Sequence, residues 1–295
     1  MAAETNVIKV ADLARVQSID FVNRFGENIN KLMEALSVTR QLPVQAGMVI
    51  NRYKSADVTL AGGVVAEGDV IPLSKVKTNP AVPVTVELKK YRKAVTAEAI
   101  QRSGYDHAVA ETDDALLREL QKGIRADLFG HITTNAAATV AYEVGLQGAI
   151  ATAWGQIQTK FEDDSAKTLA FVNPIDVAKY QGSANITVQK EFGMNFVEGF
   201  LDATVITNTS VPAGTIYATA SENIVMAYIP MGTSEVARAF GLTADETGYL
   251  GMTHSPQEDR ATIQSLVMSG INLFTEREDG LVKVVITEPE APVAP

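Results

Sequence analysis

The longest regular pattern of hydrophobic and polar positions lies between Thr112 and Ile132. Leucine and isoleucine recur every three or four residues, at Leu116, Leu117, Leu120, Ile124, Leu128 and Ile132. This spacing places these side chains on one face of a helix. Thr112 is expected to cap the start, and Asp113 and Asp114 put negative charge at the positive end of the helix dipole. The pattern predicts a helix about 30 Å long with one apolar edge.

The opposite face of this predicted helix is charged and includes Arg118 and Arg125. A second helical pattern, in residues 21–36, places Phe21, Phe25, Ile29, Leu32, Met33 and Leu36 on one face. Such a helix belongs either to the core of its own chain or to a contact with another subunit, and the pattern leaves both open. Residues 1–17 lack a dense apolar pattern and are predicted to form an extended arm.

Residues 47–101 change to strand character. MVINRYKSADVTL (48–60) and VPVTVELKKYRKAVTAEAI (82–100) are two strand-rich runs, joined by AGGVVAEGDVIPLSKVKTNPA (61–81). We predict a long two-stranded arm with an elaborate tip. An isolated hairpin is marginally stable in water, so the arm must lie against something. Residues 52–102 carry nine basic and five acidic residues, so its support is either an acidic surface or its own domain.

The second half of the chain predicts mixed helix and strand. Residues 150–161 have a helical apolar spacing, and the buried strand LAFV runs into NPIDVAKYQG, where Asn173 is the expected cap and Gly182 the stop. Short β-rich runs follow. Near the end, EDG is expected to be a hairpin turn between the strands Asn272–Thr275 and Leu281–Ile286. The Pro-rich residues 289–295 are predicted to be disordered.

Charge is divided unevenly along the chain. The net charge of the 295 residues is −10; residues 1–112 hold 14 Lys and Arg against 12 Asp and Glu, and residues 113–295 hold 11 against 23. This asymmetry suggests that one part of the molecule meets a different part of a second copy. The acidic total argues against a dedicated nucleic-acid binder. The absence of cysteine excludes disulfides and thiolate chemistry.

Catalytic motifs are not found. The chain has no glycine-rich dinucleotide loop, no phosphate loop, no paired metal-binding histidines and no nucleophile elbow. His107, His131 and His254 are interpreted as surface or core-edge residues. The one catalytic alternative is a hydrolase that uses carboxylates as acid and base, and its candidates are Asp163, Asp164 and Glu258.

The order of these parts resembles the major capsid protein of tailed bacteriophages, the Hong Kong type α+β fold shared with encapsulins. The segments that carry the resemblance are the VAEGDVIPLSKVK tip, the run YRKAVTAEAIQRSGYD entering the long helix, FVNPIDVAKYQG and DGLVKVVI. The resemblance implies an N-terminal arm (1–45), a projecting hairpin or E-loop (46–101) and a peripheral domain with the spine helix (102–137 and 256–288). An axial α/β domain (138–255) and the tail (289–295) complete it.

The resemblance also implies a function without catalysis, cofactor or metal. Subunits would form pentamers and hexamers, aided by a scaffolding protein and a portal, and would enclose double-stranded DNA without sequence-specific binding. No membrane partner is expected, and the location would be the virion capsid, reached through the host cytoplasm. An encapsulin compartment is the alternative. Residues expected at inter-subunit contacts are Lys75, Lys77, Arg118 and Arg125.

Overall fold

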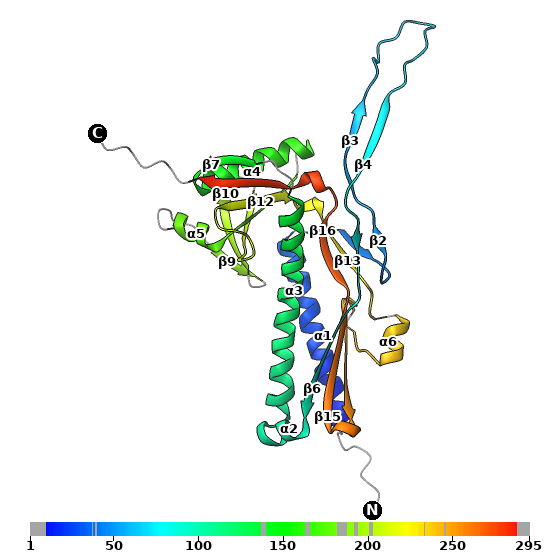
Figure 1. Ribbon diagram of the computed structural model, residues 1–295, viewed down its shortest axis with the longest axis vertical. Helices are drawn as coiled ribbons and strands as arrows, with labels where there is room; N and C mark the ends of the chain where they lie inside the picture. The colour runs from blue at the N-terminus through cyan, green and yellow to red at the C-terminus, as the bar shows by residue number, and fades with distance from the viewer. Residues whose placement is uncertain are drawn as a thin grey trace, which may run out of the picture. The chain divides into compact units, whose positions relative to one another are not determined.

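The computed structural model describes residues 10–36, 38, 40–136, 140–162, 166–181, 188–191, 194–200, 203–232, 234–244 and 246–287. The chain divides into two compact units (Figure 1). Unit 1 is made of Met1–Met48, Thr85–Leu128 and Val225–Leu273. Unit 2 is made of Val49–Val84, Phe129–Ile224 and Phe274–Pro295. The five-part division expected from the resemblance stays a prediction.

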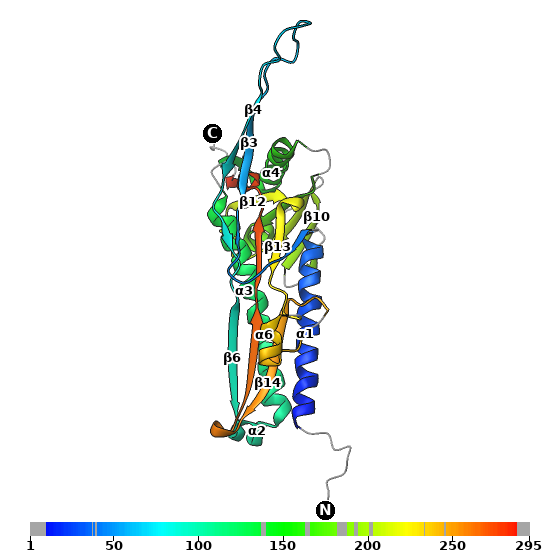
Figure 2. The same ribbon diagram turned by 90° about the vertical axis from the view of Figure 1, so that its right-hand side faces the viewer.

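Unit 1 combines a long helix with a small sheet. Helix α1 (Val10–Ala35) packs along β14 (Leu250–Gln257), and β14, β15 (Thr262–Ser269) and β6 (Lys89–Thr96) form an antiparallel sheet in that order (Figure 2). The apolar face of α1 is buried within its own chain, at Phe21, Phe25, Ile29 and Leu32, and Leu36 in the turn after the helix is also buried. The helix predicted at residues 21–36 is therefore confirmed as a core helix.

The extended arm predicted for residues 1–17 is wrong from Val10 onward, because α1 begins there. Once a helix has nucleated, adding residues is inexpensive, so α1 extends beyond its apolar stripe. Residues 1–9 lie outside the described residues. A second sheet of three strands holds β1 (Arg40–Pro43), β13 (Ile224–Tyr228) and β16 (Ile271–Thr275), with β1 parallel to β13. The short helix α6 (Glu235–Phe240) precedes β14.

Helix α3 (Glu111–Asn135) confirms the predicted long helix. Its apolar edge is buried at Leu117, Leu120, Ile124, Leu128 and Ile132, whereas Leu116 is only partly covered. In unit 1, Leu120 and Ile124 line a small hollow with Phe25 of α1 and with Ser269 and Ile271 from the C-terminal strands.

Thr112 does not cap α3, so that prediction is wrong. The π-helical turn Asp106–Ala110, which follows α2 (Ala97–Ser103), leads directly into α3 and leaves Thr112 inside the helical region. Its hydroxyl donates to the carbonyl oxygens of Ala108 and Val109, at 2.8 and 2.9 Å, instead of accepting from a backbone N–H.

Unit 2 is built on a seven-stranded mixed sheet with the order β7-β17-β12-β8-β11-β10-β9. The strands are β7 (Val140–Val144), β8 (Thr168–Val172), β9 (Val188–Glu191), β10 (Met194–Phe200), β11 (Ala203–Thr207), β12 (Thr215–Ala220) and β17 (Val282–Thr287). Helix α4 (Gly145–Phe161) buries Leu146, Ala149, Ile150, Ala153 and Ile157 against β8, β12 and β17. The helix predicted at 150–161 is confirmed.

The junction between β8 and helix α5 (Pro174–Gln181) also agrees with its prediction. The side chain of Asn173 caps α5, because its Oδ1 accepts from the backbone N–H of Ile175 at 2.8 Å. Asp176 accepts from the N–H of Gly214 at 2.7 Å and so ties the first turn of α5 to the loop before β12. The expected stop at Gly182 lies outside the described residues.

The projecting hairpin is present, but its strand pairing differs from the prediction. β3 (Tyr53–Thr59) pairs antiparallel with β4 (Lys75–Pro80), which lies inside the segment assigned to the tip. The run expected to return along β3 forms β5 (Val84–Thr85), which pairs with β2 (Val49–Ile50), and then β6, which pairs with β15. Alternation identifies a strand but not its partner, so the sequence pattern could not choose β4.

The C-terminal hairpin predicted around EDG is wrong. β16 pairs in the sheet of β1 and β13, whereas β17 lies between β7 and β12 in the seven-stranded sheet. The residues between them form the 3₁₀ turn η4 (Glu278–Gly280), in which a Cβ on Gly280 would meet Asn223 and Phe161 at 2.7 Å. No helix among the described residues is long and apolar enough to cross a membrane. The expected disordered tail lies outside the described residues.

Candidate assembly surfaces

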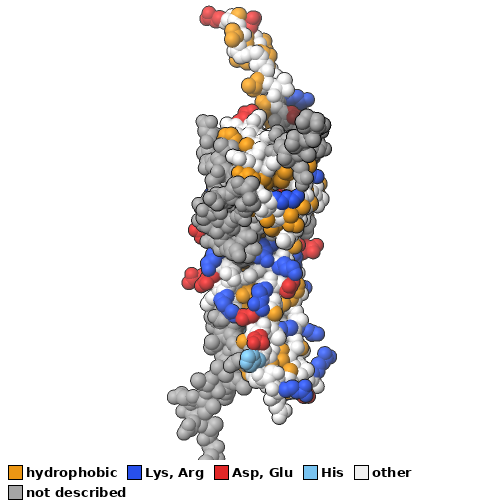
Figure 3. Space-filling view, turned by 90° about the vertical axis from the view of Figure 1, so that its left-hand side faces the viewer, with side chains coloured by type: hydrophobic (Ala, Val, Ile, Leu, Met, Phe, Trp, Pro, Cys, Tyr) orange, Lys and Arg blue, Asp and Glu red, His pale blue; other side chains and the backbone are white. Residues whose placement is uncertain are grey.

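The hairpin made of β3, β4 and the loop between them carries most of the exposed apolar surface of the described residues. Of the fourteen large hydrophobic side chains that are exposed in the described part of the chain, eight lie between Tyr53 and Pro80, and Met48, Val49 and Val82 lie next to this hairpin. Val64, Val70 and Leu73 in the loop are 102%, 91% and 96% exposed. Figure 3 shows hydrophobic side chains gathered on the hairpin, with acidic side chains at its end. A concentration of exposed apolar side chains marks an interaction surface.

Lys75 and Lys77 lie together on this hairpin. They are two residues apart on β4, so their side chains point to the same face, and both are exposed. Lys77 stands opposite Asp57 of β3, and Lys75 stands opposite Thr59 at the loop end of the ladder. The loop itself, residues 60–74, contains the acidic Glu67 and Asp69 and no basic residue. The hairpin therefore has a basic strand and an acidic, apolar loop.

Arg52 holds the base of the hairpin to the rest of unit 2. The residue is 3% exposed; its Nε donates to the carbonyl of Val82 at 2.9 Å and its Nη1 donates to the carbonyl of Thr275 at 3.0 Å. The backbone carbonyl of Arg52 accepts from Ala81 N–H at 2.9 Å. Both ends of the hairpin are thereby joined to β16. Lys54 adds an ion pair with Glu278 on η4 at 3.9 Å.

His131 completes this anchor from the C-terminal part of α3. Its Nε2 lies 3.3 Å from Nη1 of Arg52, 3.3 Å from the backbone nitrogen of Thr275 and 3.2 Å from the Thr275 hydroxyl. Burial, and secondly the positive charge of Arg52, lower the pKa of His131 from 6.5 to about 4. The ring is therefore neutral near pH 7. Burial lowers the pKa of Arg52, and Glu278 acts in the opposite direction.

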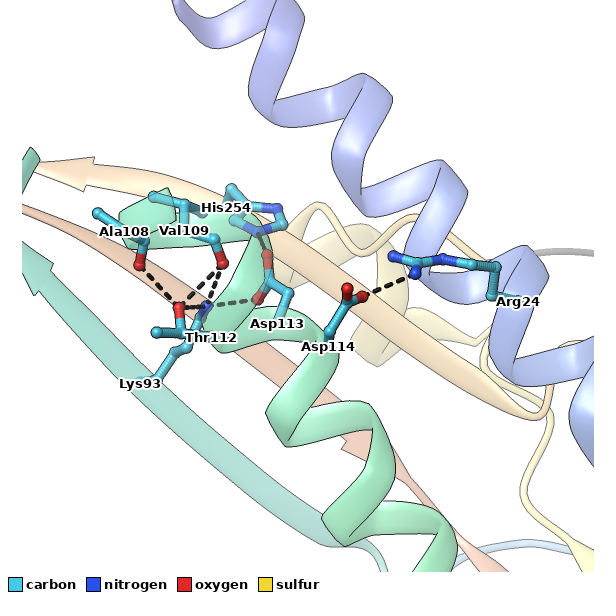
Figure 4. Close-up of polar contacts among 8 residues, drawn as sticks. All are labelled: Arg24, Lys93, Ala108, Val109, Thr112, Asp113, Asp114 and His254. Atoms are coloured by element: carbon cyan, nitrogen blue, oxygen red, sulfur yellow. Dashed lines mark hydrogen bonds and ion pairs between the residues drawn. The ribbon is translucent and has the colours of Figure 1, made fainter. Parts of the chain in front are cut away.

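A separate buried ion-pair network lies at the start of α3 in unit 1 (Figure 4). Asp113 is 3% exposed; its Oδ2 is 3.1 Å from Nε2 of His254 on β14, and its Oδ1 is 2.6 Å from Nζ of Lys93 on β6. Lys93 and Oδ1 of Asp113 form an ion pair without a well-aligned hydrogen bond. Burial lowers the pKa of Lys93, while Asp113 and Asp114 oppose that shift.

This network joins three elements of unit 1. Lys93 also donates to the carbonyl of Val109 at 2.9 Å and to the hydroxyl of Thr112 at 2.5 Å. The neighbouring Asp114 pairs with Arg24 of α1 at 2.7 Å, a contact that is far more exposed. Asp113 and Asp114, which were predicted to favour the start of the helix, therefore also contact β6, β14 and α1. Removing one member of a buried charged group leaves the others unpaired at high cost.

Arg118 and Arg125 do not share one environment. Arg118 is exposed on α3, whereas Arg125 is partly covered and burial lowers its pKa. Both belong to unit 1, whereas Lys75 and Lys77 belong to unit 2. Their role as inter-subunit contacts stays a prediction.

The three histidines occupy different environments. The side chain of His107 is 72% exposed beside Glu111, His131 is partly buried, and the side chain of His254 is 0% exposed. The core-edge interpretation fits His131 and His254, both of which are of intermediate exposure as residues, and the surface interpretation fits His107. Apart from Asn135, four residues further along α3, the partners of His131 and His254 lie 79, 144 and 141 residues away in the chain, so no local motif could have indicated them.

The structure gives little support to a catalytic site formed by the carboxylates of the hydrolase alternative. Glu258 is exposed on the 3₁₀ turn Glu258–Arg260, and Asp163 and Asp164 lie outside the described residues. Among the residues that the structure describes, no three His, Asp or Glu side chains come together in a way that could hold a metal ion.

The chain shares its fold with viral and encapsulin shell proteins, as comparison with solved structures shows. No family model and no curated protein sequence matches the chain. The holo-SrpI encapsulin complex of Synechococcus elongatus matches with a TM-score of 0.54 and 13% identity, covering 98% of this chain and 96% of that chain. The capsid of cyanophage P-SCSP1u matches with a TM-score of 0.55 and 9% identity, covering 87% and 88%.

A third match is the mature capsid of bacteriophage PhiM1, with a TM-score of 0.53, 10% identity and 85% of each chain covered. At these identities the comparisons establish the fold. The chain thus has the α+β Hong Kong type capsid fold that its sequence resembles.

Proposed function

We propose that this chain is a major capsid protein that assembles with copies of itself into an icosahedral shell around double-stranded DNA. The observation that supports this most directly is the hairpin Tyr53–Pro80, which extends from unit 2 with apolar side chains exposed on its strands and loop. A two-stranded hairpin with such a surface needs a partner. A neighbouring copy of the chain provides one at every position of a closed shell.

The charge distribution supports contacts between unlike surfaces. The hairpin presents Lys75 and Lys77 on one face of β4 and two acidic residues in its loop, so it can meet a neighbour through both signs of charge. We propose these lysines, together with Arg118 and Arg125 of α3, as inter-subunit contacts. An overall net charge of −10 suits a wall that encloses DNA without binding it tightly.

The proposed organisation follows the five parts expected from the sequence. The hairpin acts as the E-loop, α3 as the spine helix of the peripheral domain (102–137 and 256–288), and the region 138–255 as the axial domain. Pentamers and hexamers would build the shell with a scaffolding protein and a portal. The virion capsid is the final location, and assembly takes place in the host cytoplasm.

An encapsulin compartment is the second candidate, because an encapsulin is among the solved structures that share this fold. The contents of particles purified from the native source separate the two functions. Packaged double-stranded DNA protected from nuclease supports the capsid, and a protein cargo supports the compartment.

Light scattering and sedimentation of the purified chain over a wide concentration range test shell formation. The expected result is a sharp rise in mass above a threshold concentration, because each subunit gains several contacts at once. A compact monomer at every concentration and salt condition tested, with or without a scaffolding protein, contradicts the proposal.

A further inference from the structure

The hydrogen bonds around His131 define which ring nitrogen is the acceptor. The Arg52 guanidinium and the backbone N–H of Thr275 can only donate, and both lie 3.3 Å from Nε2. Nε2 must therefore carry a lone pair, and the proton of the neutral ring is on Nδ1. The amide nitrogen of Asn135 lies 3.0 Å from Nδ1 and donates to the backbone carbonyl of His131 at 3.0 Å, so a proton on Nδ1 requires the amide to turn its oxygen toward the ring and to give up that bond.

Protonation of His131 would disrupt this arrangement in two ways. Nε2–H would face two donors, with the Thr275 hydroxyl at 3.2 Å as its one acceptor among these contacts, and a second positive charge would stand beside Arg52 in a largely buried site. The other groups around the ring are uncharged: Thr275, Asn135 and the ring of Phe274, whose centroid is 6.5 Å away. Glu278 on η4 acts on Arg52.

Arg52 joins both ends of the hairpin to β16. Because Nε2 of His131 is an acceptor that orients the Arg52 guanidinium, it also orients the hairpin. We infer that neutral His131 is a positioning residue for the hairpin, and that acid releases the hairpin base by turning this acceptor into a cation. The inference rests on the proposed function, in which the hairpin is the assembly element. It adds His131 as a residue, and acidic pH as a condition, that control the position of the hairpin.

Hydrogen exchange of the unassembled full-length chain, read on peptides spanning residues 51–56, 78–84 and 272–276, tests the anchor directly. Two variants are compared with the unchanged chain. His131→Gln offers a neutral amide oxygen as an acceptor for Arg52, and His131→Leu fills similar space without an acceptor. We expect exchange within about threefold of the unchanged chain for the glutamine variant, and at least about tenfold faster exchange at the hairpin base for the leucine variant.

The pH profile separates this role from general packing. In the unchanged chain, protection of these three peptides, corrected for the intrinsic pH dependence of exchange, should fall as pH drops through about 4, whereas the glutamine variant should keep it. Equal protection at pH 3.5 and pH 6 in the unchanged chain would overturn the inference. So would identical behaviour of the glutamine and leucine variants. If the leucine variant does not fold, the pH comparison between the unchanged chain and the glutamine variant still decides.

Assembly is measured on the same three proteins by sedimentation. A leucine variant that exchanges rapidly at the hairpin base but forms shells at the usual concentration would refute the link between the anchor and assembly, while the shell function would stand. An unchanged chain that forms no shells would refute the function, and the exchange data would still report on the anchor.

Discussion

Replacing Val70, Ile71 and Leu73 by threonine tests whether the apolar loop of the hairpin is covered in an assembly. These side chains are 91%, 75% and 96% exposed, so their loss should change the free energy of unfolding of the unassembled chain by no more than about 0.5 kcal/mol each. Threonine replaces part of each apolar side chain with a hydroxyl group.

The expected effect on assembly follows from the hydrophobic surface that a neighbour would cover. Full burial of a Val, Ile or Leu side chain contributes about 1.5–3 kcal/mol, and we assign roughly 1 kcal/mol of loss to each threonine. The three changes together weaken each hairpin contact by about 3 kcal/mol, which corresponds to about a 100-fold weaker association. The concentration needed for shell formation should rise by a similar factor.

The assay is light scattering against concentration, with thermal unfolding of the unassembled variant as a check on folding. Ile175→Thr is the matched control, because Ile175 is another exposed isoleucine, at 58%, but lies on α5 away from the hairpin. The control should assemble within about threefold of the unchanged chain, as expected for a single surface change. Assembly of the triple variant at the usual concentration would refute the role given to the loop.

Three further predictions concern charge. The double variant Lys75→Glu, Lys77→Glu should hinder assembly more at low salt than at high salt, because salt screens exposed charges. Equal assembly of this variant at low and at high salt would show that these two charges are unimportant. Asp113→Ala should lower the free energy of unfolding of the unassembled protein by about 3 kcal/mol, whereas Asp114→Ala, at a side chain that is 43% exposed, should lower it by under 1 kcal/mol. Similar losses for the two variants in denaturant unfolding would contradict the buried network. The pKa of His131 is lowered in the folded chain, so as the pH falls the unfolded chain takes up a proton at this residue before the folded chain does. The free energy of unfolding should therefore fall by up to about 3 kcal/mol between pH 6.5 and pH 4. A His131→Gln variant whose free energy of unfolding shows the same pH slope would contradict this.

The sequence predicted elements that depend on local spacing. Helix α3 was expected at 112–132 and is observed at Glu111–Asn135, because its apolar residues repeat within a few turns of one another. The cap at Asn173 and the helix after it were likewise local. By contrast, the partner of β3 and the position of β17 depend on residues far along the chain, and alternation alone does not identify a strand's neighbour.

Strand β14 has no clear alternating pattern for a related reason. Its sequence, LGMTHSPQ, contains glycine, proline and polar residues, and it is held by pairing with β15 and by packing on α1. The residues of the candidate assembly surfaces likewise differ in whether a local sequence signal points to them. Lys75 and Lys77 were named from their place near the tip of the predicted hairpin, and their role as contacts stays a prediction. The Arg52 and His131 anchor joins segments 79 residues apart and has no local signal.

Electron microscopy of the purified chain, alone and with a scaffolding protein, tests the central claim most directly. The account predicts closed, regular shells in which the hairpin of each subunit lies on a neighbouring subunit. Particles that remain dispersed monomers at every concentration, or shells in which the hairpin contacts no neighbour, would contradict it.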